Sequence, residues 1–134
     1  MKQITEDFVS FEIAKLLKEK GFDESVNRFY ELSTGEPIMV RTEFTRNSYT
    51  TSFACPTHQM ALKWLREAHN IHIIPYFDKI QPSDLPYTFA VYIVDEYIAT
   101  REIIACFDID ENLYWSKPEQ AVDAALDYVL KNLI

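Results

Sequence analysis

The sequence contains little glycine, little cysteine and few basic side chains. Its two glycines, Gly21 and Gly35, leave no glycine-rich loop of the kind that holds a phosphate group or a dinucleotide. Its two cysteines, Cys55 and Cys106, are too few for a disulfide scaffold, and a chain of 134 residues can bury a core without one. These shortages exclude the common nucleotide-binding motifs and favour free thiols.

Long apolar runs are also missing. Acidic residues interrupt the short apolar segments near the N-terminus, and no run of about 18 apolar residues occurs. The composition is 48% hydrophobic and 14% aromatic, which is typical of a packed globular protein. We therefore expect a cytoplasmic protein that forms one domain over residues 1–134, with no signal peptide and no contact with a membrane.

Basic residues are scarcest in the C-terminal half. The formal net charge is -8, and the excess of acid lies within residues 78–127, where the only bases are Lys79, Arg101 and Lys117. The acids of this segment are Asp78, Asp84, Asp95, Glu96, Glu102, Asp108, Asp110, Glu111, Glu119, Asp123 and Asp127. Nucleic acids bind to clustered lysine and arginine, so this distribution argues against a nucleic-acid ligand.

The first of three helical segments covers residues 6–20. Its apolar residues recur on one face, as in an amphipathic helix. Gly21 can take the left-handed conformation that ends a helix, and Phe22 can then fold back on Leu17. We predict that this helix ends at Gly21.

Two further helices are predicted. One covers residues 57–68, with Pro56 suited to its first turn and Asn70 suited to the left-handed residue at its end. The other runs to the C-terminus, and an S-x-x-E capping box of Ser116 and Glu119 is predicted to start it.

Segments rich in β-branched and aromatic residues predict five strands, at residues 26–32, 37–44, 71–77, 87–94 and 101–107. The first two flank a turn and predict a hairpin. Pro75 cannot donate a hydrogen bond to a neighbouring strand and indicates an edge strand. The last two are apolar on both faces and are expected in the middle of a sheet. The order α-β-β-α-β-β-β-α predicts an α+β fold, with a mostly antiparallel sheet of about five strands and three helices packed against it.

Three segments together resemble a known family. They are FVSFEIAKLLKEKGFDE near the start, PTHQMALKWLREAHNIHI in the middle and SKPEQAVDAALDYVLKNLI at the end. In this order they resemble a family of small uncharacterised proteins from phages and mobile elements of gut Bacteroidales. The resemblance implies a mobile-element context and no particular activity.

The middle segment contains the residue types of a zinc site. Cys55 and His58 read as C-x2-H, and His69 and His72 follow as H-x2-H. A helix of about eleven residues between the two pairs is about 16 Å long, so both pairs cannot bind one ion. We therefore expect no cofactor and no four-ligand metal site, which leaves a two-ligand half-site at either end.

A thiol nucleophile is the other catalytic possibility. Cys55 precedes a helix, whose N-terminal dipole can lower the pKa of a thiol. If Cys55 is the N-cap, His58 lies at the third helical position, close to the sulfur. The alternative is a small buried residue, which is how most free cysteines behave. A small thiol-dependent or metal-dependent enzyme that uses Cys55 with His58, or His69 with His72, thus stays open as a second interpretation.

The main interpretation is a non-enzymatic accessory protein that binds another protein, possibly a basic one, through its acidic and aromatic C-terminal half. Glu119, Asp123 and Asp127 recur every four residues along the last helix, on the side away from its apolar face. A solvated helix face explains the same pattern. A homodimer through an edge strand or an apolar helix face also stays open. The predicted partner-binding residues are Glu119, Asp123, Asp127, Asp110, Glu111 and Trp115.

Overall fold

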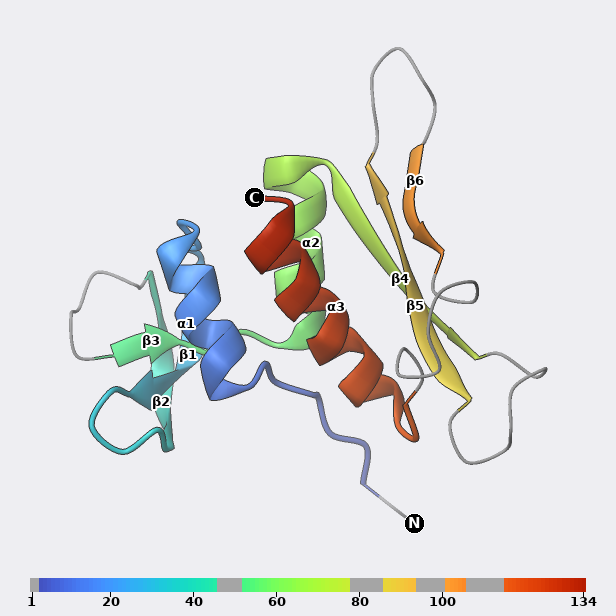
Figure 1. The fold of residues 1–134 in the computed structure, drawn as a ribbon. Coiled ribbons are helices and arrows are strands. Elements are labelled where there is room, and N and C mark those ends of the chain that lie inside the picture. Colours follow the sequence, from blue (N-terminus) through green and yellow to red (C-terminus); the bar gives the residue numbers. More distant parts are fainter. Residues whose placement is uncertain (1–2, 46–51, 78–85, 94–100, 106–114) are drawn as a thin grey trace.

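The structure is a computed structural model that describes residues 3–45, 52–77, 86–93, 101–105 and 115–134 (Figure 1). Its helices are α1 (Phe11–Glu19), α2 (His58–His69) and α3 (Pro118–Asn132). Its strands are β1 (Ser25–Glu31), β2 (Pro37–Thr45), β3 (Ser52–Ala54), β4 (Ile71–Phe77), β5 (Tyr87–Ile93) and β6 (Arg101–Ala105). The predicted α+β class is confirmed, and the order along the chain matches the prediction apart from β3.

The strands form two antiparallel sheets, with the orders β2-β1-β3 and β4-β5-β6. Figure 1 shows the helices between the sheets: α1 lies against the first, and α2 and α3 lie on the side of the second. One hydrophobic core runs through these layers and joins Phe29 of β1, Leu17 of α1, Leu126 of α3 and Val91 of β5. The helices therefore hold together two sheets that the sequence suggested were one.

The arrangement of the strands differs from the expectation in two places. The short strand β3 lies at the end of a polar stretch and was not predicted. It pairs with β1 through Phe29 opposite Ala54 and Tyr30 opposite Phe53, so a distant partner defines it. In the described part of the second sheet, β5 is central as expected, whereas β6 is at an edge. Pro75 lies on β4, which is the other edge, as predicted.

The helix starts also differ from the predicted ones. Helix α1 starts at Phe11, where the Ser10 side chain accepts a hydrogen bond from the Ile13 N–H at 3.3 Å. Residues 6–9 are not helical; the Val9 N–H donates to the Pro56 carbonyl at 3.1 Å. The N-terminal segment therefore runs beside the chain that leads into α2.

Both remaining helices start one or more residues later than predicted. The N-cap of α2 is Thr57, which accepts from the Met60 N–H at 3.2 Å, so Cys55 precedes the helix and His58 is its first residue. The predicted capping box of α3 is wrong. Its N-cap is Lys117, and the Ser116 hydroxyl instead bonds the Gln120 side chain at 3.1 Å.

The helix ends are confirmed. Gly21 has φ of 92° and its N–H donates to the Lys18 carbonyl, while the Phe22 N–H donates to the Leu17 carbonyl at 2.9 Å. Phe22 is fully buried by this turn. At the end of α2, Asn70 is left-handed with φ of 56°.

Replacing Gly21 by alanine is expected to lower the free energy of unfolding by about 1 kcal/mol, because a side chain disfavours a positive φ. A Cβ atom at this position meets nothing within 4 Å, so the effect comes from the backbone alone. Urea unfolding measures it. Asn70→Gly is the matched control. It places glycine at another residue with a positive φ, and it is expected to change stability little because asparagine already tolerates this conformation. A neutral Gly21→Ala would contradict the assignment.

Candidate functional site

The three helices begin at the same end of the molecule (Figure 1). Near their starts, His58 of α2 contacts Asp123 of α3, with 3.0 Å between Nε2 and Oδ1. At the other end, the Lys20 ammonium after α1 donates to the Ile134 carbonyl at 2.9 Å. The helices are therefore roughly parallel, and their positive dipole ends lie together.

The contact between His58 and Asp123 is partly buried. The whole His58 residue is 7% exposed, whereas the Asp123 side chain is 35% exposed. The backbone N–H of His58 also donates to the Asp7 carbonyl at 2.9 Å. His58 thus joins the N-terminal segment, α2 and α3. Because Asp123 contacts Nε2, this nitrogen is not free to act on a nucleophile as it does in a Ser-His-Asp triad.

Cys55 lies close to this contact but is fully enclosed. Its side chain is buried, and its thiol donates to the Val9 carbonyl at 3.5 Å. The Tyr30 hydroxyl donates to the same carbonyl at 2.8 Å. Burial raises the pKa of the Cys55 thiol to about 11, and it raises the pKa of the Tyr30 hydroxyl to about 12.

These pKa values oppose a nucleophilic role for Cys55. A reactive cysteine has its pKa lowered, so that a thiolate is present near neutral pH. Here burial outweighs the two influences that lower the pKa, which are the hydrogen bond with Tyr30 and the positive charge of Arg28. The thiol stays protonated at neutral pH and acts as a hydrogen-bond donor within the core.

Arg28 lies beside this group. Its guanidinium carbon is 4.3 Å from the centre of the Phe8 ring, which is the geometry of a cation–π contact. Its Nε atom is buried and has no hydrogen-bond partner among the described residues. Arg28 therefore adds a positive charge next to the buried hydroxyl and thiol.

The two pairs of zinc-ligand residue types lie at opposite ends of α2, as the sequence indicated. Cys55 and His58 are at its start, whereas His69 is its last residue and packs edge-on against Trp64, with 4.8 Å between ring centres. His72 follows in β4. Among the residues that the structure describes, no group of three or more His, Cys, Asp or Glu side chains is placed to hold a metal ion.

The predicted partner-binding residues are in different situations. Asp123 contacts His58, and Asp127 pairs with Lys131 at 2.9 Å, so the lysine offsets the charge of Asp127. Glu119 is partly exposed in the first turn of α3. Asp110 and Glu111 lie outside the described residues.

Trp115 packs against strand β5 of the second sheet. Its ring stacks on Phe89, with 5.7 Å between centres, and its backbone exchanges two hydrogen bonds with Tyr87, at 2.8 and 3.1 Å. It is only partly exposed. Its main contacts therefore hold the start of α3 against β5.

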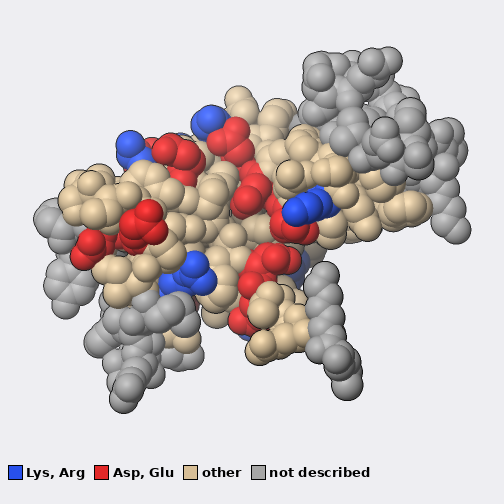
Figure 2. Space-filling view, turned by 90° about the horizontal axis from the view of Figure 1, so that it is seen from below, with Lys and Arg blue, Asp and Glu red and all other residues tan. Residues whose placement is uncertain are grey.

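The fold brings acidic residues of the N-terminal part of the chain to the same end as the start of α3. Glu6 and Asp7 are exposed in the N-terminal segment, and Glu12 is exposed in the first turn of α1. Seen from the end where the helices begin, acidic side chains gather across the middle of the molecule (Figure 2). We call Glu6, Asp7, Glu12, Glu119 and Asp123 the acidic face. The pairing of the N-terminal segment with the chain before α2, together with the contact between α1 and α3, places these positions at one end of the molecule.

Comparison with known proteins gives no family for this chain: no family model, curated protein or solved structure matches it. Within the described part, none of the helices has the length and apolar character that crossing a bilayer requires.

Proposed function

We propose that this chain is a non-enzymatic accessory protein, of a phage or mobile element, that binds a basic partner protein through the acidic face. The observation that carries the proposal is the gathering of carboxylates where the three helices begin (Figure 2). Such a surface attracts a positively charged protein and speeds its association. The buried, protonated Cys55 supports a binding role over thiol catalysis.

The proposed interface lies at the start of α3 and not along its middle, where the sequence pattern placed Asp127. Lys131 offsets the charge of Asp127, whereas Glu12 and Glu119 have no ion pair within the described part of the chain. The helix dipoles also favour acids at these starts, which explains how the fold tolerates their proximity. Glu12 and Glu119 are therefore the side chains to reverse in a test.

The double variant Glu12→Lys/Glu119→Lys is expected to lose at least about tenfold in partner binding, because reversed charges repel a basic surface. The matched control is Glu19→Lys/Asp127→Lys, which makes the same change of charge at later positions of the same two helices. Affinity capture from cells that carry the protein identifies the partner, and titration with the purified partner measures the loss.

Binding should also weaken as salt is raised, since salt screens exposed charges. Equal losses in the two double variants would show that net charge alone matters. A loss confined to the control would place the interface farther along α3. Full binding by Glu12→Lys/Glu119→Lys would remove the acidic face as the interface.

A further inference from the structure

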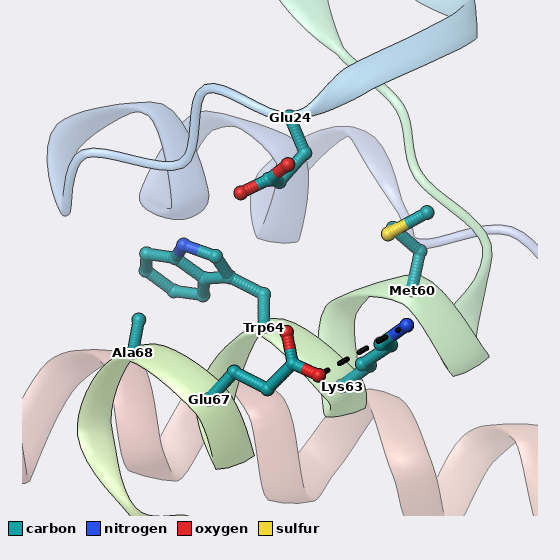
Figure 3. Close-up of a pocket in the computed structure, with 6 residues that line it drawn as sticks. All are labelled: Glu24, Met60, Lys63, Trp64, Glu67 and Ala68. Carbon is teal, nitrogen blue, oxygen red and sulfur yellow. Dashed lines mark ion pairs between the residues drawn. The ribbon is translucent and has the colours of Figure 1, made fainter.

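A groove lies between α2 and the chain that enters β1. Its volume is about 380 Å³, and it is lined by Glu24, Met60, Lys63, Trp64, Glu67 and Ala68. Figure 3 shows Trp64, Met60 and the carboxylates of Glu24 and Glu67 around one space. Two neighbouring hollows, of about 260 and 500 Å³, also have Met60 in their walls. Met60 therefore separates the groove from the hollows near the start of α2.

Trp64 forms a fixed aromatic wall of this groove. It is 9% exposed, and its ring is held edge-on by Phe22, with 5.5 Å between centres, and by His69. Figure 3 shows the indole nitrogen on the side of the ring that is nearer Glu24. The indole N–H therefore reports on a ligand that enters the space between Trp64 and Glu24.

The two carboxylates of the groove can take a positive charge. Glu24 is exposed and has no ion pair among the described residues. Among the described residues, Glu67 forms an ion pair only with Lys63, at 3.9 Å, and these side chains are 70% and 58% exposed. A contact so long and so exposed is weak, and a better cation can displace the lysine.

We propose that this groove binds an arginine side chain of a partner protein. The planar guanidinium lies against the exposed part of the Trp64 indole and donates hydrogen bonds to the carboxylates of Glu24 and Glu67. The methylene groups of the arginine lie along Met60.

The composition of the groove selects this ligand over others. Two carboxylates repel a phosphate or another anion. A neutral apolar side chain would leave both carboxylates without a partner, whereas arginine supplies donors for both and an aromatic contact. Lysine carries the same charge but cannot donate in a fork to two acids while it lies flat against an indole.

This inference does not depend on the acidic face. None of the residues that line the groove beside Trp64 belongs to that face. A small arginine compound can therefore report on the groove whether or not a protein binds where the helices begin.

The test is a nuclear magnetic resonance titration of the full chain with N-acetyl-argininamide. The indole N–H signal of Trp64 is expected to shift in a saturable way, while that of Trp115 is an internal reference. N-acetyl-citrullinamide, which has the same shape without the charge, is expected to leave the Trp64 signal in place. N-acetyl-lysinamide is expected to bind at least about threefold more weakly than the arginine probe.

Variants distinguish binding in the groove from attraction of the cationic probe to the negative protein as a whole. Glu24→Gln is expected to weaken binding at least about fivefold, because it removes a charged acceptor from the groove. Glu19→Gln removes an exposed carboxylate elsewhere and is expected to have no effect. Lys63→Ala is expected to tighten binding about twofold, because it frees Glu67.

Three results would overturn the proposal: no shift of the Trp64 signal, an equal shift with the citrulline compound, or equal affinities of the Glu24→Gln and Glu19→Gln variants. Weaker binding by Lys63→Ala would show that the lysine helps to hold the ligand, which contradicts the displacement proposed above.

Discussion

Replacing Leu126 by alanine is expected to lower the free energy of unfolding by about 2–5 kcal/mol. Leu126 is fully buried on α3, the helix that contacts α1 on one side and β4 and β5 on the other. Removing its side chain leaves a cavity in the one core that the two sheets share. Urea unfolding, followed by circular dichroism and by tryptophan fluorescence, measures the loss.

The two signals are expected to give the same midpoint, because Trp64 and Trp115 report on different parts of a single core. The control is Leu32→Ala. Leu32 is 50% exposed, so this variant is expected to change stability by less than about 1 kcal/mol. If the midpoints separate in Leu126→Ala, each sheet has a core of its own and α3 does not unite them.

The features that the sequence predicted well depend on a few neighbouring residues. Gly21 and Phe22 complete their turn with carbonyls of the preceding helix, and Asn70 ends α2 by its own backbone preference. The pattern S-x-x-E was also local but gave the wrong start for α3, because the Ser116 hydroxyl bonds the Gln120 side chain instead of a backbone N–H.

The features that the sequence did not predict depend on distant partners. Strand β3 is three residues long and is extended because it pairs with β1. The division into two sheets depends on which strands pair, which alternating apolar residues do not determine. The acidic face also depends on distant partners. The His58 N–H donates to the Asp7 carbonyl, and His58 contacts Asp123, so the N-terminal acids lie near α3.

Raising the pH is expected to destabilise the protein through Cys55 and Tyr30. The pKa of the Cys55 thiol rises from its ordinary 9.0 to about 11, and that of the Tyr30 hydroxyl rises from 10.0 to about 12. The folded chain therefore keeps protons that the unfolded chain has lost. This stabilisation is complete below about pH 9 and is lost as the pH rises through 11 and 12.

The loss from Cys55 alone is expected to reach about 2 kcal/mol near pH 10.5. Urea unfolding at about pH 8 and about pH 10.5 measures it in a chain with Cys106 replaced by serine. The same chain with Cys55→Ala in addition is expected to start less stable, because a buried group is missing, but to lose about 2 kcal/mol less between the two pH values.

This comparison also decides the role of the thiol. If both proteins lose stability equally, the pKa of Cys55 is the same in the folded and unfolded chains, and burial does not hold the proton on it. A larger alkaline loss with Cys55 present instead means that burial holds the proton on the thiol, as expected for a group that donates a hydrogen bond to the Val9 carbonyl within the core.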